Sequence, residues 1–326
     1  MKLHQKLYAT FAMLGVSASA VATDFSSLES LIKQTKEVAN LPSGTAIAVV
    51  KDDEIIYESY FGYADIAKQK KVDANTSFYI ASITKPYYAL STLMKEHQGS
   101  ISESTSLKTL FPKMNFEGFE PDKVTIKHLL SHSMGIDNEP LAMVTAYNGA
   151  HDLETRKALV EKSYINKEAP LNTFEYSNVG YNILSVWEDQ TTGKNWQDNL
   201  QNLVFSPLAN SNTSAYISDA SKKNWTLAKP YSVRTGNHEP LYLFKKDNTM
   251  HSAGGMISSA RDMANFLKVQ LNKGMLNGKQ VFPKSVIEKS QQKVVDADTK
   301  YGDFKRDGYA WGWYIGPYMG ETLYHH

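Results

Sequence analysis

Apolar and polar positions recur along the chain with two different periods, and these periods predict where helices and strands lie. From residue 26 to 39 apolar side chains recur every three or four positions, which predicts an amphipathic helix that opens with a capping box, Ser26 to Glu29. Its apolar side carries Phe25, Leu28, Leu31, Ile32 and Val38. The stretch GTAIAVVKDDEIIYESYFGYAD, residues 44–65, instead has two runs rich in Val, Ile and Tyr around an Asp-Asp turn, which predicts a β-hairpin.

The later segments are mostly helical until the last twenty residues or so. A short apolar run, TSFYIAS, leads to a helix predicted over 83–98 and stopped by Gly99. Three more helices are predicted, one ending at Gly135, one ending at Gly193 and one running from Ser258 or Ser259 to Gly274. The end of the chain, YAWGWYIGPYMGETLYHH, alternates aromatic residues with glycines and predicts two strands.

This order of elements predicts the fold class. Strands come first, a long helical region follows, and strands return at the end, which is typical of an α/β chain of the α+β type. We expect an antiparallel sheet built from both chain ends, flanked by helices, with an inserted mainly helical region.

The first 22 residues predict a signal peptide rather than part of the fold. A short basic start, MKLHQK, precedes an apolar stretch that is too short to cross a bilayer, and Ala20-Val21-Ala22 offers a small-x-small cleavage site. We therefore expect an exported protein, periplasmic or secreted, whose single domain spans 23–326. The last predicted strand stops abruptly at His326, so we expect this domain to be cut short of its natural C-terminus.

Composition narrows the classes of partner. The chain has 326 residues with 35 Lys and Arg against 34 Asp and Glu, and a net charge of +1 argues against nucleic acid or an anionic surface as main partner. No later run is long enough for a membrane span, so we expect no stable membrane insertion. The absence of cysteine excludes disulfides, thiolate metal sites and a cysteine nucleophile. We expect a small-molecule or peptide substrate.

Ser82 and Lys85 are the candidate catalytic pair. A serine needs a base to attack at neutral pH, and positions i and i+3 on a helix lie about 5–6 Å apart on one face. The same spacing occurs at Ser30 and at Ser290, but only Ser82 follows an apolar strand and opens an apolar helix, whereas Ser290 lies in a polar stretch that looks like surface. A lysine walled by apolar groups can have its pKa lowered enough to accept a proton. The alternative is a helix-capping serine beside a surface charge.

A second candidate element is Tyr176-Ser177-Asn178, in a polar turn before a helix. A tyrosine hydroxyl can relay protons if a nearby ammonium lowers its pKa, and an asparagine amide can hold a substrate carbonyl or orient the lysine. The alternatives are a core tyrosine with a satisfied hydroxyl and a helix-capping asparagine.

With these elements the chain resembles the serine β-lactamase-like family, in which S-x-x-K carries the nucleophile. The resemblance is to its class C branch: class C β-lactamases, penicillin-binding and D-alanyl-D-alanine peptidase-like proteins, and related esterases. It rests on an ordered set of segments that covers about residues 44 to 326, namely AVVKDDEIIYESYFGYAD, FYIASITKP, TIKHLLSHSMGI, FEYSNVGYNIL, HSAGGMISSARDMANFL and YAWGWYI.

The resemblance implies roles for the candidate residues. It implies Ser82 as the acylated nucleophile, Lys85 as its activating base, Tyr176 as partner in proton transfer, and Asn178 as a hydrogen-bonder of substrate and lysine. The family's third element is H-x-G or K-x-G on a strand that lines the site, and His325 or His326 could open it. We favour His326, with an exposed chain end as the alternative.

The sequence therefore predicts an exported serine hydrolase that acts through an acyl-enzyme on a β-lactam, a D-amino-acid peptide or a small ester. Nine scattered histidines show no H-E-x-x-H, and there is no G-x-S-x-G elbow, so we expect neither a metal site nor an α/β-hydrolase, and no cofactor. The alternative from another class is a penicillin-recognising binding or sensor protein that acylates but turns over slowly or not at all.

Overall fold

The structure is a computed structural model that describes residues 24–149, 152–191, 193–232, 238–241 and 244–326. The predicted signal peptide, 1–22, lies outside the described residues. None of the helices in the described part of the chain is long and apolar enough to cross a bilayer.

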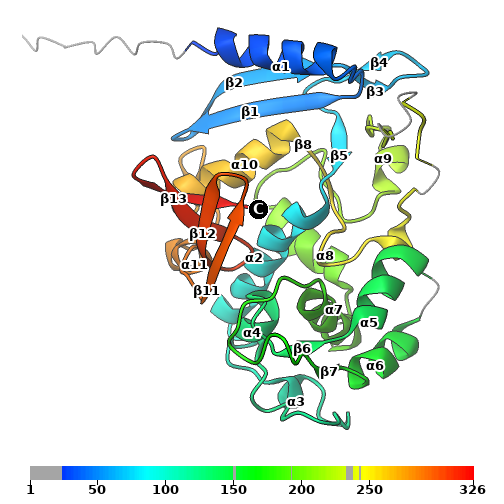
Figure 1. Cartoon of the computed structure of the whole chain (residues 1–326), viewed down its shortest axis with the longest axis vertical. Helices are drawn as coiled ribbons and strands as arrows, with labels where there is room; N and C mark the ends of the chain where they lie inside the picture. Colours follow the sequence, from blue (N-terminus) through cyan, green and yellow to red (C-terminus); the bar gives the residue numbers. More distant parts are fainter. Residues whose placement is uncertain (1–23, 150–151, 192, 233–237, 242–243) are drawn as a thin grey trace, which may run out of the picture.

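The N-terminal segments form a layered unit at one end of the molecule (Figure 1). The predicted hairpin is confirmed as β1 (Thr45–Lys51) and β2 (Glu54–Phe61), which pair antiparallel around the Asp-Asp turn. Helix α1 (Ser26–Val38) lies over one face of this hairpin and α10 (Ala260–Leu271) over the other.

Two details predicted for α1 are wrong. The capping box does not form, because the Ser26 N–H and hydroxyl both donate to the Asp24 carboxylate, each at 2.9 Å. Leu31 and Val38 are 60% and 81% exposed. The helix covers the hairpin with a narrower stripe, in which Phe25 stacks on Tyr57 with ring centroids 4.5 Å apart.

Helix α2 (Thr84–His97) runs through the centre of the molecule and is buried on every side from Thr84 to Leu93. Tyr87, Tyr88, Leu90 and Leu93 on α2 are all at most 2% exposed. It packs against α11 (Lys284–Ser290) and α8 (Trp196–Leu200). It ends as predicted, before Gly99, which takes a left-handed φ of 74°.

The inserted region is mainly helical, as predicted. Its remaining helices are α3 (Leu107–Leu110), α4 (Ile126–Leu130), α5 (Glu139–Met143), α6 (Leu153–Glu161), α7 (Val179–Thr191) and α9 (Asp219–Lys222), with π-helical turns at Val144–Asn148 and Gln201–Phe205. Helix α4 ends at Leu130 and not at Gly135, since His132 already takes a left-handed φ of 59°. Helix α7 approaches α4 so closely that a Cβ at Gly180 would lie 2.1 Å from the Leu129 carbonyl oxygen.

The C-terminal strands form a four-stranded antiparallel sheet in the order β11 (Val295–Tyr301), β12 (Phe304–Tyr309), β13 (Tyr314–Tyr318) and β14 (Glu321–His325). The two predicted strands are β13 and β14, and the other two were not predicted. Four short antiparallel pairs complete the described strands: β3 (Tyr63–Asp65) with β4 (Lys70–Lys71), β5 (Ser77–Tyr79) with β8 (Ile257–Ser259), β6 (Ile136–Asp137) with β7 (Tyr164–Ile165), and β9 (Met275–Leu276) with β10 (Lys279–Gln280).

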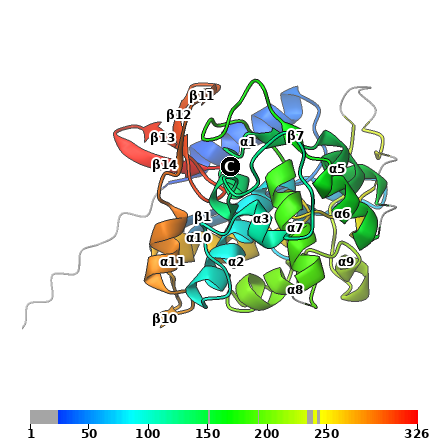
Figure 2. The ribbon, with the colours of Figure 1, turned by 90° about the horizontal axis from the view of Figure 1, so that it is seen from below.

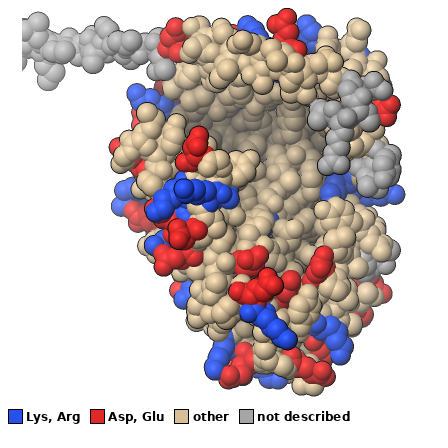
Figure 3. Space-filling model, in the orientation of Figure 1, with Lys and Arg blue, Asp and Glu red and all other residues tan. Residues whose placement is uncertain are grey.

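The fold class is confirmed, with one difference in how the sheet is built. The two chain ends contribute separate antiparallel sheets, because among the described strands β1 is hydrogen-bonded only to β2, and β14 only to β13. The chain end lies beside α2, near the middle of the molecule in both views (Figures 1 and 2). The surface there is hollowed below the α1 and hairpin layer, with mostly uncharged walls (Figure 3).

Candidate active site

Ser82 lies in the tight connection between β5 and α2. Strand β5 is fixed by its pairing with β8, and the Ile80 N–H donates to the Met256 carbonyl at 3.0 Å. The chain then turns sharply through Ala81, at φ 46°, into the 3-10 turn Ala81–Ile83. Ser82 therefore belongs to this turn and does not open the long helix as predicted, since α2 begins at Thr84.

Lys85 is directed at Ser82 and is completely buried. Its Nζ lies 3.1 Å from Ser82 Oγ and donates to Asn178 Oδ1 at 2.9 Å and to the Ala253 carbonyl at 2.8 Å. All three partners are uncharged, so no opposite charge among them offsets the free-energy cost of removing a protonated lysine from water. Burial accordingly lowers the pKa of Lys85 to about 7. A large fraction of Lys85 is thus neutral at physiological pH and able to accept a proton from Ser82.

Tyr176 faces the same pair. Lys85 Nζ lies 4.7 Å from the centroid of its ring. Burial raises the pKa of Tyr176 to about 12, and this outweighs a hydrogen bond with Ser82 that acts in the opposite direction. The condition stated for a proton relay, a pKa lowered by a nearby ammonium, is therefore not met, and Tyr176 is a protonated phenol at neutral pH. In that form it can donate a proton but cannot act as a resting base.

The tautomer of His326 follows from its partners. Its Nδ1 lies 2.7 Å from the Gly312 carbonyl, which can only accept, so Nδ1 carries the proton. Burial lowers the pKa of His326 to about 3, so the ring is neutral and its Nε2 is an acceptor. The Tyr176 hydroxyl lies 3.1 Å from that Nε2 and donates to it. The lone pairs of the Tyr176 oxygen are then free to face Ser82.

The structure thus brings the five predicted residues, Ser82, Lys85, Tyr176, Asn178 and His326, into one connected cluster. The other two serine–lysine pairs are not built in this way. Ser30 is exposed on α1, and its hydroxyl donates to the Ser26 carbonyl. Ser290 is not at the surface as expected. It is the last residue of α11 and is 2% exposed, and its hydroxyl donates to the Ile287 carbonyl at 2.7 Å.

Sequence reasoning missed the residues that support Tyr176 and His326 from behind. His132 is 1% exposed, with its ring centroid 4.5 Å from that of Tyr176. Its Nδ1 accepts from the Ser177 N–H at 3.2 Å, so its Nε2 carries the proton and donates to the Tyr309 hydroxyl at 3.2 Å. The polar SHS triplet after α4 is a weak sequence signal for such a residue, because only the fold shows that it points inward.

Gly312 is a second missed residue, and here the signal was the glycine itself. Its φ is +89°, and a Cβ at this position would lie 2.5 Å from the Pro86 Cα on α2. This close approach places the carbonyl that orients His326 directly beside the helix that carries Lys85. The described residues contain no group of three or more His, Asp, Glu or Cys side chains placed to hold a metal ion.

Comparison with known proteins places the chain in a family. The profile of the Beta-lactamase family matches residues 28–326. Protein flp of Staphylococcus aureus (strain COL) is 24% identical over 292 residues, which cover 88% of this chain and 55% of the relative. Penicillin-binding protein 4* of Bacillus subtilis (strain 168) is 27% identical over 180 residues, 53% of this chain and 38% of the relative. The chain therefore spans about half the length of the curated relatives it matches.

Solved structures with the same fold include the octameric penicillin-binding protein homologue from Pyrococcus abyssi, with a TM-score of 0.76, 25% identity, and coverage of 93% of this chain and 68% of the other. The D-amino acid amidase from Ochrobactrum anthropi SV3 has a TM-score of 0.71 at 19% identity, covering 92% of this chain and 84% of the other. EstCE1, described as a hydrolase with promiscuous acyltransferase activity, has a TM-score of 0.73 at 19% identity, with 88% and 81% covered.

Proposed function

The chain belongs to the β-lactamase family, and from this premise we propose that it is a serine hydrolase that acts through an acyl-enzyme formed on Ser82. The observation that carries the proposal is the contact of Ser82 Oγ with a fully buried lysine at 3.1 Å. The lysine needs no further base to be neutral, since burial lowers its pKa to about 7.

The proposed acylation step transfers the Ser82 proton to the leaving group and replaces the bond from the substrate carbonyl carbon to that group with a bond to Ser82 Oγ. Neutral Lys85 accepts the Ser82 proton while Oγ bonds to the substrate carbonyl carbon. Backbone N–H groups, including that of Ser82, hold the oxyanion. The bond from carbon to the leaving nitrogen or oxygen then breaks, and the proton passes from Lys85 through the Tyr176 hydroxyl to the leaving group. In the second step water attacks the carbonyl carbon of the ester and gives its proton to neutral Lys85, with the Tyr176 hydroxyl only relaying it. The bond from that carbon to Ser82 Oγ then breaks, Oγ takes the proton back from Lys85, and the acid leaves.

Asn178 and His326 hold this arrangement in place. Asn178 Oδ1 accepts one Lys85 hydrogen, which leaves its amide nitrogen to donate to a substrate carbonyl. His326 accepts from Tyr176 and so fixes which way the phenol hydrogen points at rest. We propose that both residues orient groups through hydrogen bonds and that neither forms a covalent bond to substrate.

We propose that the substrate is an amide or ester, drawn from D-amino-acid peptides and amides, small esters and β-lactams. Relatives whose names include a D-amino acid amidase and a promiscuous hydrolase support this range. The walls of the hollow in Figure 3 are mostly uncharged, which favours neutral esters and amides over the substrate of a dedicated β-lactamase. The signal-like segment 1–22 supports our further proposal that the protein is exported to the periplasm or secreted.

The test is to mix the full chain with a nitrophenyl ester, a D-amino acid amide and a penicillin, following product release and intact mass. Release of nitrophenol or ammonia without a lasting adduct supports the hydrolase. A stable penicillin adduct with no turnover favours the penicillin-recognising binder. Ser82→Ala should abolish every signal, whereas Ser30→Ala should change none, and activity retained in Ser82→Ala would remove Ser82 from the mechanism.

A further inference from the structure

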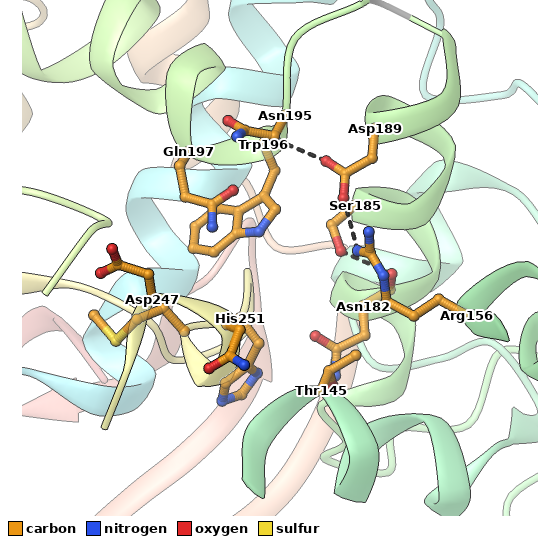
Figure 4. Close-up of a pocket in the computed structure, with 12 residues that line it drawn as sticks. Thr145, Arg156, Asn182, Ser185, Asp189, Asn195, Trp196, Gln197, Asp247 and His251 are labelled. Atoms are coloured by element: carbon orange, nitrogen blue, oxygen red, sulfur yellow. Dashed lines mark hydrogen bonds and ion pairs between the residues drawn. The ribbon is translucent and has the colours of Figure 1, made fainter. Parts of the chain in front are cut away.

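A second pocket, separate from the candidate active site, has a cavity volume of about 200 Å³ (Figure 4). It is lined by residues of helices α6, α7 and α8, of the turn Val144–Asn148 and of the segment 247–251. None of Ser82, Lys85, Tyr176, Asn178 or His326 lines it. The residues used below are Arg156, Asn182, Asp189, Trp196, Asp247 and His251.

Two side chains in this pocket are buried without hydrogen-bond partners among the described residues. Asn182 on α7 is 0% exposed, and neither its amide oxygen nor its amide nitrogen has a partner. His251 is 7% exposed, and its Nδ1 has no partner. Figure 4 shows Asn182 and His251 on opposite sides of the same space. Native proteins rarely leave such groups unpaired, so a polar occupant is expected between them.

The charged groups of the pocket are already engaged. Arg156 donates to Asp189 at 2.7 Å, and Asp189 also accepts from the Trp196 N–H at 3.0 Å. Asp247 accepts from the N–H and the hydroxyl of Ser218, at 2.9 and 2.6 Å. Burial lowers the pKa of His251 to about 3, so this ring is neutral. Among the lining residues, the buried side-chain atoms left without a partner belong to Asn182 and His251, and both groups are uncharged, which disfavours a charged occupant.

We propose that this pocket binds a primary carboxamide. Such a group has one acceptor and two donors, which match the free oxygen and nitrogen of Asn182, while its second hydrogen or its oxygen reaches the His251 ring. The size is suitable, because a cavity of about 150 Å³ accommodates a molecule as large as benzene. The carboxamide belongs either to a free small amide or to a side chain of the substrate, and the experiment separates these two sources.

The pocket adjoins the groups that hold Lys85. The Asn182 N–H donates to the Asn178 carbonyl at 3.2 Å, and Asn178 in turn accepts from Lys85. On the other side, a Cβ at Gly254 would lie 3.1 Å from His251 Nε2 and 3.5 Å from the carbonyl carbon of Ala81, next to Ser82. An occupant therefore touches side chains that lie one residue layer from the reacting atoms.

The direct test is to measure binding of propionamide to the full chain by saturation-transfer NMR and calorimetry. The control ligand is 2-butanone, which has a similar shape but lacks the amide hydrogens. Saturable binding is expected for wild type and for Ser82→Ala, so this result does not depend on acylation. Asn182→Leu should weaken binding by about tenfold or more, the effect of losing a buried amide contact. Asn265→Leu, at an asparagine outside the pocket, should bind as wild type.

Melting curves establish that each variant is folded, and His251→Phe provides a second variant if Asn182→Leu does not fold. Competition of propionamide with a glutamine nitrophenyl ester, but not with its methionine analogue, identifies a substrate side chain as the source. If propionamide instead changes kcat for both esters and leaves KM constant, the source is a free small amide. If propionamide binds no better than butanone, or binds equally to Asn182→Leu and His251→Phe, the pocket holds water only and the proposal is wrong.

Discussion

The lowered pKa of Lys85 can be measured as a pH dependence of stability. Lysine in the unfolded chain keeps its proton up to about pH 10.5, whereas burial lowers the pKa of folded Lys85 to about 7. Between these values the unfolded state binds more protons than the folded state, so the free energy of unfolding rises with pH. Lys85→Met removes this contribution while keeping most of the side-chain volume.

The magnitude follows from the pKa values of the folded and unfolded lysine. A difference of one between two pKa values corresponds to about 1.4 kcal/mol, so burying Lys85 costs folding on the order of 5 kcal/mol at low pH. Between pH 7 and pH 9 wild type should gain about 2 kcal/mol relative to Lys85→Met, because folded Lys85 is already half deprotonated at pH 7. Other titrating groups are shared by both proteins and cancel in the difference.

The assay is urea unfolding of both proteins at half-unit pH intervals, with activity recorded on the same samples. Lys33→Met, at an exposed position on α1, is the matched control and should run parallel to wild type. Turnover of the wild type should rise with pH through about 7, as Lys85 becomes neutral. If wild type and Lys85→Met stay parallel from pH 7 to 9, Lys85 keeps its proton in the folded state and cannot be the base.

Three further substitutions test the packing around Ser82 and Lys85 and along α2. Tyr176→Phe should slow turnover by a factor on the order of 10²–10⁴, measured as kcat/KM, and a wild-type rate would make the residue a packing group. Gly312→Ala should lower the free energy of unfolding by about 1–3 kcal/mol, because its Cβ would meet the Pro86 backbone at 2.5 Å, and an unchanged melt would contradict this close packing. Lys95→Met should lower the free energy of unfolding by about 3–5 kcal/mol, because it removes the buried cation that lies 2.6 Å from the Glu188 carboxylate on α7. A loss below about 1 kcal/mol would show that this ion pair is dispensable for stability.

Local patterns predicted much of the fold. The hairpin, α7, α10 and the last two strands follow from short-range periodicity and from glycines at their ends, and the structure has them where the sequence placed them. The predicted capping box of α1 is wrong because Asp24 accepts the Ser26 N–H that the box would use. The predicted end of α4 is wrong because His132 adopts a left-handed φ, which its residue type does not indicate.

The candidate site divides in the same way. Ser82 and Lys85 could be found because one turn of chain brings them together. The Ala253 carbonyl, His132 and Gly312 reach the site from distant segments, so their spacing along the chain does not show that they meet there. The sequence allowed a proton relay at Tyr176 if an ammonium lowered its pKa, but burial of the phenol raises that pKa to about 12, and burial depends on the packing of the whole fold.

The central claim is that Ser82 is the nucleophile, and covalent labelling tests it most directly. The full chain is treated with a fluorophosphonate, digested, and mapped by mass spectrometry, with Ser82→Ala, Ser30→Ala and Ser290→Ala in parallel. The account predicts one modified serine, Ser82, in wild type and in the two control variants, and no label in Ser82→Ala. Labelling of Ser82→Ala to the same extent, or a wild-type label on any other serine, would contradict it.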